Sequence, residues 1–92
     1  LINLRDICSI AEQNNMAIAS FNVPSFEALR AAVDVAEQTG YPVILSHAEG
    51  HDPFAPLDKI GPAMVALAER SSATLCVHLD HCEHLSYMYK AL

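Results

Sequence analysis

Positive charge is scarce in this sequence. Its 92 residues include five Lys and Arg residues against eleven Asp and Glu residues, which gives a formal net charge of −6, and the basic residues form no cluster. A nucleic-acid partner is not expected, because the phosphate backbone requires a basic protein face. No stretch approaches the roughly 18 to 20 apolar residues that a membrane span needs, and no signal peptide is visible, so no membrane partner is expected.

Cysteine is also sparse, and Cys8, Cys76 and Cys82 have no C-x-x-C spacing. This argues against a disulfide framework and favours a reducing, cytoplasmic location, with all three as small buried hydrophobic residues. The sequence contains no G-x-G-x-x-G, Walker loop, nucleophile elbow or H-E-x-x-H. Nucleotide-binding, α/β-hydrolase and zincin functions are therefore not favoured.

What the sequence does contain is a regular alternation of helical and strand patterns. Apolar positions at helical spacing predict helices over residues 3–14, 24–39, 58–70 and 83–92. Short apolar runs predict buried strands over residues 16–23, 42–48 and 73–81. Asn3 and Asp58 are expected as N-caps. Residues 49–56, rich in Gly, Pro and Asp, are predicted to form a long loop.

This alternation predicts an α/β fold with parallel strands joined by right-handed crossovers. Two architectures fit, an open doubly wound sheet and part of an eight-stranded barrel. A complete barrel takes about 250 residues, so three strands cannot close one. The chain begins at Leu1 without an initiator Met and stops at Leu92 within a predicted helix. We therefore expect residues 1–92 to be part of a longer, single domain.

Polar residues gather at the carboxyl ends of the predicted strands, which is the functional face in both architectures. They are Ser20, Asn22, Ser46, His47, His78, Asp80 and His81. His81 beside Asp80 indicates a metal ligand next to a carboxylate. Strand alternation would send these two side chains to opposite faces, so both reach one site only if the strand ends at about Asp80.

Structural roles are the alternative interpretation for several of these side chains. His78 is expected to be buried, and Tyr87 is expected to pack its helix. Solvated or capping positions are expected for His47, His51 and His84. A catalytic zinc ion normally has three protein ligands, and the sequence around His81 supplies no two others at suitable spacing.

Four sequence blocks together resemble a known family. They are "NLRDI", "SFNVPSFE", "PVILSHAEG" and "VHLDHCE". In this order they resemble the N-terminal third of the class II, zinc-dependent fructose-bisphosphate and tagatose-bisphosphate aldolases, over essentially the whole chain. The resemblance implies the N-terminal portion, about three strands, of a TIM (β/α)8 barrel. It also implies a lyase of carbohydrate metabolism such as glycolysis, which reversibly cleaves a phosphorylated ketose to dihydroxyacetone phosphate and an aldehyde.

The resemblance also implies roles for individual residues. Asp80 would exchange a proton with the hydroxyl at the bond made or broken, His81 would be a zinc ligand, and Asn22 would lie at the substrate pocket. Zn²⁺ would act as a Lewis acid on the ketone oxygen and stabilise the enediolate. Ala48 departs from the family, which commonly has a substrate-holding serine there, and this leaves the sugar open. Family analogy implies a homo-oligomer.

Two alternatives stay open on the sequence alone. The first is a small flavodoxin-like α/β binding module, complete in itself, whose strand-end polar residues only anchor loops. The second is an aldolase homologue that has lost catalysis and keeps the barrel for assembly. Because one histidine cannot hold a catalytic zinc ion and three strands cannot enclose a pocket, residues 1–92 alone are expected to be inactive.

Overall fold

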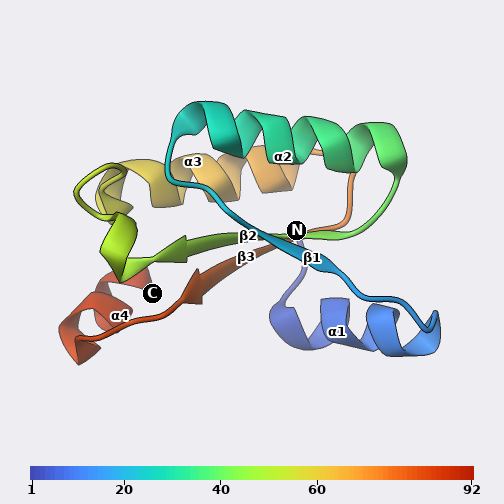
Figure 1. The fold of residues 1–92 in the computed structure, drawn as a ribbon, viewed down its shortest axis with the longest axis horizontal. Helices are drawn as coiled ribbons and strands as arrows, with labels where there is room; N and C mark the ends of the chain where they lie inside the picture. The colour runs from blue at the N-terminus through green and yellow to red at the C-terminus, as the bar shows by residue number, and fades with distance from the viewer.

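The computed structural model describes all of residues 1–92 and has helices and strands in strict alternation (Figure 1). The helices are α1 (Leu4–Gln13), α2 (Phe26–Thr39), α3 (Leu57–Arg70) and α4 (Leu85–Ala91). The strands are β1 (Ala19–Asn22), β2 (Val43–Ala48) and β3 (Leu75–Asp80), and a short 3₁₀ helix, η1 (Glu49–His51), follows β2. The predicted element order is confirmed.

The three strands form one parallel sheet in the order β1-β2-β3. Helices α2 and α3 cover one face of this sheet, and we call the opposite face the open face (Figure 1). Helix α1 lies near the amino end of the strands, while η1 and α4 lie at their carboxyl end (Figure 1). Each strand therefore runs toward the η1–α4 end, where the sequence places its polar residues.

The apolar core lies between the sheet and helices α2 and α3. Helix α2 begins at Ser25, whose hydroxyl accepts a hydrogen bond from Ala28 N. It ends at Gly40, whose φ of 75° is a left-handed conformation that glycine adopts without a steric penalty. The core residues are Val23, Leu29, Ala32, Val33, Ala36, Val43, Leu45, Ala55, Ile60, Met64, Ala68 and Leu75. No helix has the length and apolar content that a membrane crossing requires.

The first strand differs from its prediction. A buried strand was expected over residues 16–23, but β1 has four residues and all of them are exposed. Strand β1 is at the edge of the sheet, and the helices pack over β2 and β3 instead. Only Val23, directly after the strand, enters the core. An apolar run therefore indicated the strand correctly but not its burial, which depends on what lies above it.

Two local predictions are also wrong. Asp58 is not the N-cap of α3, because Pro56 holds that position and Asp58 lies in the first turn. The carboxylate of Asp52 accepts the hydrogen bond from Leu57 N instead, at 3.1 Å. Of the three cysteines, all of them free, Cys76 is buried but Cys8 is exposed. Helix α1 packs through its one buried residue, Ile7, which turns Cys8 toward solvent.

Candidate functional site

The open face carries polar side chains from all three strands at their carboxyl ends. The register places Asn22 beside Ser46 and Ser46 beside His78, with Ala48 beside Asp80 one step further along. Neighbours in register share a face of a parallel sheet, and Leu45 is in the core, so these residues point to the open face. The sequence prediction that polar groups converge at one end of the sheet is thus confirmed.

Strand β3 ends at Asp80, as a shared site for Asp80 and His81 requires. His81 has a φ of 35°, in the left-handed region that few non-glycine residues adopt. This turn brings His81 Nε2 to 3.6 Å from Asp80 Oδ2, while His81 N donates a hydrogen bond to Asp80 Oδ1 at 3.1 Å. The two side chains therefore lie together, although simple alternation would have separated them.

The His81 imidazole is accessible and adjoins an acidic group. Its side chain is 87% exposed, and that of Asp80 is 40% exposed. An exposed imidazole beside a carboxylate suits a single zinc ligand with an orienting partner. No group of three or more His, Cys, Asp or Glu side chains in the chain is arranged to hold a metal ion. The residues present therefore provide one zinc ligand and do not complete a zinc site.

His78 lies on the same face as Asp80, with 3.9 Å between His78 Nε2 and Asp80 Oδ1. It was expected to be buried, yet its side chain is 31% exposed. Asn22 is exposed on this face as well. His78 thus lies at the functional end of the sheet with Asp80, as its position in the strand predicts, but the burial expected for it was wrong.

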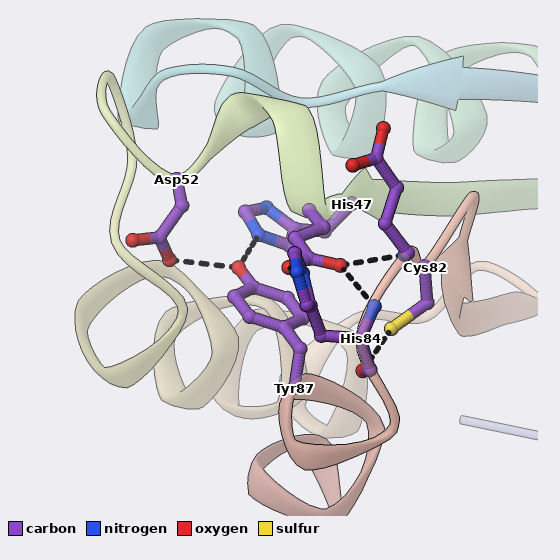
Figure 2. Close-up of polar contacts among 7 residues, drawn as sticks. His47, Asp52, Cys82, His84 and Tyr87 are labelled. Atoms are coloured by element: carbon purple, nitrogen blue, oxygen red, sulfur yellow. Dashed lines mark hydrogen bonds and ion pairs between the residues drawn. The ribbon is translucent and has the colours of Figure 1, made fainter.

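Glu49 holds the loop that carries His81. Its Oε2 accepts hydrogen bonds from Glu83 N at 2.6 Å and His84 N at 3.0 Å, and its Oε1 pairs with His84 Nδ1 (Figure 2). Glu49 N also donates to the carbonyl of His81 at 3.3 Å. Sequence reasoning missed Glu49, because it stands at the start of a segment whose composition indicates only a loop.

The Glu49 carboxylate and the His84 ring stabilise each other in their charged forms. Partial burial acts to raise the pKa of Glu49, but the hydrogen bonds from His84 and Glu83 outweigh it and hold that pKa below its ordinary value. The hydrogen bond to Glu49 raises the pKa of His84. His84 was expected to be solvated or capping, and its side chain is 69% exposed; it occupies the N-cap position of α4, where its side chain pairs with Glu49 and makes no capping bond.

A second polar group, on the helix-covered side, is buried. Tyr87 OH lies 2.7 Å from both Asp52 Oδ1 and His47 Nε2 (Figure 2). A carboxylate only accepts, so the tyrosine hydroxyl donates to Asp52 and accepts from His47 Nε2–H. His47 is thus in the Nε2–H tautomer, and its Nδ1 is buried without a partner. A solvated or capping role for His47 was wrong, because it is only 2% exposed.

Two pKa values in this group, those of His47 and Tyr87, shift in the direction that burial predicts. Burial lowers the pKa of His47, and the neighbouring His51 ring lowers it further. Burial and the hydrogen bond to Asp52 raise the pKa of Tyr87. The capping role expected for His51 is confirmed, since its Nδ1 accepts a hydrogen bond from Ala48 N at 3.2 Å. This group joins α4 to the end of β2 and does not face the open side.

Parallel strands with polar side chains at their carboxyl ends fit both a β/α barrel and an open doubly wound sheet, and comparison with a solved structure decides between them. It superposes on the X-ray structure of the YdjI aldolase from Escherichia coli K12 with a TM-score of 0.92 and 28% identity, over 99% of this chain and 35% of that one. The fold is that of the N-terminal portion of a TIM barrel, which argues against a flavodoxin-like module.

The sequence comparisons agree with the fold. The family model of class-II fructose-bisphosphate aldolase matches residues 2–92, so the chain belongs to that family. It is 30% identical to a probable fructose-bisphosphate aldolase of Bacillus subtilis, over 100% of this chain and 33% of the relative. It is 29% identical to the fructose-bisphosphate aldolase of Ureaplasma parvum, over 88% of this chain and 29% of the relative. The chain thus spans about a third of the length of these relatives.

Proposed function

We propose that residues 1–92 are part of a single aldolase-type barrel domain, and that the whole protein is a zinc-dependent ketose-bisphosphate aldolase. The observation that carries this proposal is the left-handed turn at His81, which sets an accessible imidazole beside Asp80 at the end of β3. The chain's membership of the aldolase family supports the same assignment. The reaction is the reversible cleavage of a ketose bisphosphate to dihydroxyacetone phosphate and an aldehyde.

Asp80 is the proposed proton-transfer group. Its carboxylate accepts a hydrogen bond from His81 N and keeps further acceptor capacity toward the open face, where it is partly exposed. In cleavage Asp80 takes the proton of the substrate hydroxyl at the breaking bond, and in the reverse direction it returns that proton. His78, 3.9 Å away, supplies a second polar group next to this carboxylate.

His81 is the proposed zinc ligand in this chain, and the other ligands come from outside residues 1–92. When bound, Zn²⁺ supplies a Lewis acid that polarises the ketone oxygen of the substrate. Asp80 orients the His81 ring from its side, as carboxylates do for metal-bound histidines. Because the chain holds a single ligand, we expect residues 1–92 alone to be inactive.

Asn22 is the proposed substrate contact. Its exposed amide on β1 is in register with Ser46 of β2, which is in turn in register with His78 of β3. Ala48, the register partner of Asp80, offers no hydroxyl to the substrate. We further propose that the protein acts in the cytoplasm, in carbohydrate metabolism such as glycolysis, and assembles as a homo-oligomer, as the family resemblance implies.

The test is made on the full-length protein. We expect it to contain zinc and to release dihydroxyacetone phosphate from fructose 1,6-bisphosphate or tagatose 1,6-bisphosphate, with activity lost on chelation and regained with Zn²⁺. His81→Ala should remove most of the bound zinc, whereas His51→Gln, which changes a histidine away from the open face, should retain it. A folded protein without zinc and without cleavage of either sugar would instead identify a non-catalytic homologue.

A further inference from the structure

The loop between β3 and α4 is held by one residue, Glu49, through its side chain and its backbone N–H. Residues 81–84 make hydrogen bonds within the loop, to Asp80 and to α4, and every other hydrogen bond they make is to Glu49. Those bonds engage the backbone of His81, Glu83 and His84 as well as the His84 ring. The Glu49 side chain is only 18% exposed, so its carboxylate is largely committed to this loop.

The conformation that this loop holds is one that needs support. His81 adopts a φ of 35°, and a non-glycine residue keeps such a conformation only when its surroundings determine it. Its amide bonds to the carboxylate of Asp80, and its carbonyl bonds to Glu49 N. Without these bonds, an extended His81 would continue the alternation of β3 and point away from Asp80.

Glu49 is well placed for this task. It follows Ala48 directly, and Ala48 is the register partner of Asp80. The contacts of Glu49 therefore continue the β2–β3 pairing beyond the end of β3, so that the loop keeps a fixed distance from β2. Hydrogen bonds to a carboxylate are stronger than those between neutral groups, which makes a charged side chain suited to a loop with no other outside partner.

We propose that Glu49 is a positioning residue, which holds the 81–84 loop so that the His81 imidazole lies beside Asp80 and is presented to a divalent metal ion. Glu49 acts through the loop and touches neither the metal nor the substrate. This inference deepens the proposed function and rests on His81 being a metal ligand there.

The test compares Glu49→Gln with Glu83→Gln in the full-length protein. Glutamine keeps the size of Glu49 but loses its charge and turns an amide toward the donors of the loop. Glu83 is an exposed carboxylate of the same loop, so its variant makes the same change without touching these contacts. We expect amide hydrogen exchange at residues 81–84 of the metal-free protein to be faster in Glu49→Gln only.

The second measurement is metal binding. Zinc affinity, measured by competition with a chromophoric chelator, should fall about 10- to 100-fold in Glu49→Gln, which is the usual effect of losing a group that orients a ligand. The ligand-field spectrum of the Co²⁺-loaded protein should change in the same variant. Glu83→Gln should match the unmodified protein in both measurements.

The outcomes separate this inference from the proposed function. If the unmodified protein binds no zinc, the proposed function is wrong and this inference is wrong with it. If the unmodified protein binds zinc and folded Glu49→Gln has the same affinity, exchange rates and Co²⁺ spectrum, only the role of Glu49 is overturned. Should Glu49→Gln not fold, Glu49→Asp, which keeps the charge but shortens the side chain, decides by the same three measurements, and unchanged values overturn the proposal.

Discussion

At the carboxyl end of the sheet, both faces carry histidine and aspartate side chains, but the two sets differ in burial and in hydrogen bonding. On the helix-covered side His47, Tyr87 and Asp52 form a hydrogen-bonded chain, and His47 and Tyr87 are buried. On the open face Asp80 and His81 are partly or largely exposed and retain unused hydrogen-bonding capacity. The difference suggests that a histidine and carboxylate with satisfied partners hold the structure, whereas those with spare capacity are available to a ligand.

Strand β2 shows how small the sequence difference is between the two faces. Ser46 and His47 are adjacent and both buried, yet alternation sends them to opposite sides. His47 bonds to Tyr87 of α4, and Ser46 bonds to Ser20 of β1 at 2.6 Å. Substitutions on the open face should therefore change mainly the activity, and those on the helix-covered side mainly the stability.

The largest effect is expected for Asp80→Asn on the open face. Asparagine keeps the size of the side chain but cannot take a proton, so kcat for aldol cleavage by the full-length protein should fall about 10²- to 10⁴-fold. Steady-state assays measure this, and the midpoint of thermal unfolding should change little, since Asp80 is partly exposed. Asp34→Asn, an exposed position on α2, is the matched control. Full activity in Asp80→Asn would remove Asp80 from the mechanism.

Tyr87→Phe should have the opposite profile on the helix-covered side. Removal of the hydroxyl leaves His47 Nε2 and Asp52 Oδ1 without their shared partner, at a cost of about 1–3 kcal/mol in the free energy of unfolding. Urea unfolding of the full-length protein measures this, with Tyr89→Phe, whose ring is exposed, as the control. Equal stability of the two variants would show that the buried chain does not hold α4.

The pH dependence of stability should reveal His47. Its pKa is lowered from 6.5 in the folded state, because burial disfavours the charged ring, so the unfolded state binds more protons below that pH. Stability should therefore decrease as the pH falls below about 6.5, by at most about 1.4 kcal/mol per pH unit for one proton. His47→Gln should lose this part of the slope in urea titrations from pH 7 to pH 5. An unchanged slope in His47→Gln would show that other titratable groups cause the pH dependence of stability.

The smallest effect is expected for Ala48→Ser, which adds one hydroxyl beside Asp80 on the open face. If this position contacts the sugar, KM for one ketose bisphosphate should fall a few-fold while stability stays within about 0.5 kcal/mol. Parallel assays with fructose and tagatose bisphosphates detect the difference. Identical KM values for both sugars before and after the change would place the sugar contacts elsewhere.

Much of the fold could be predicted because its determinants are local. Helical spacing of apolar residues indicated all four helices, and the apolar runs indicated all three strands, although the run that indicated β3 was predicted to extend to residue 81 and the strand ends at Asp80. Burial was predicted less well. Strand β1 is apolar but exposed at the sheet edge, and His47 is polar but buried under α4. Neither outcome is readable from a residue's immediate neighbours, because each depends on which element covers it.

The order of helices and strands, the clustering of polar groups at one end of a parallel sheet and the aldolase family all follow from sequence patterns. Which of those polar groups have hydrogen-bond partners and which remain accessible depends on the packing of elements that are distant in the chain. The partners of His47 and Glu49 lie 34 to 40 residues away, in a helix and a loop that reach them only once the sheet has formed. The left-handed turn at His81 likewise depends on the Glu49 backbone across the sheet, so no local pattern could indicate it.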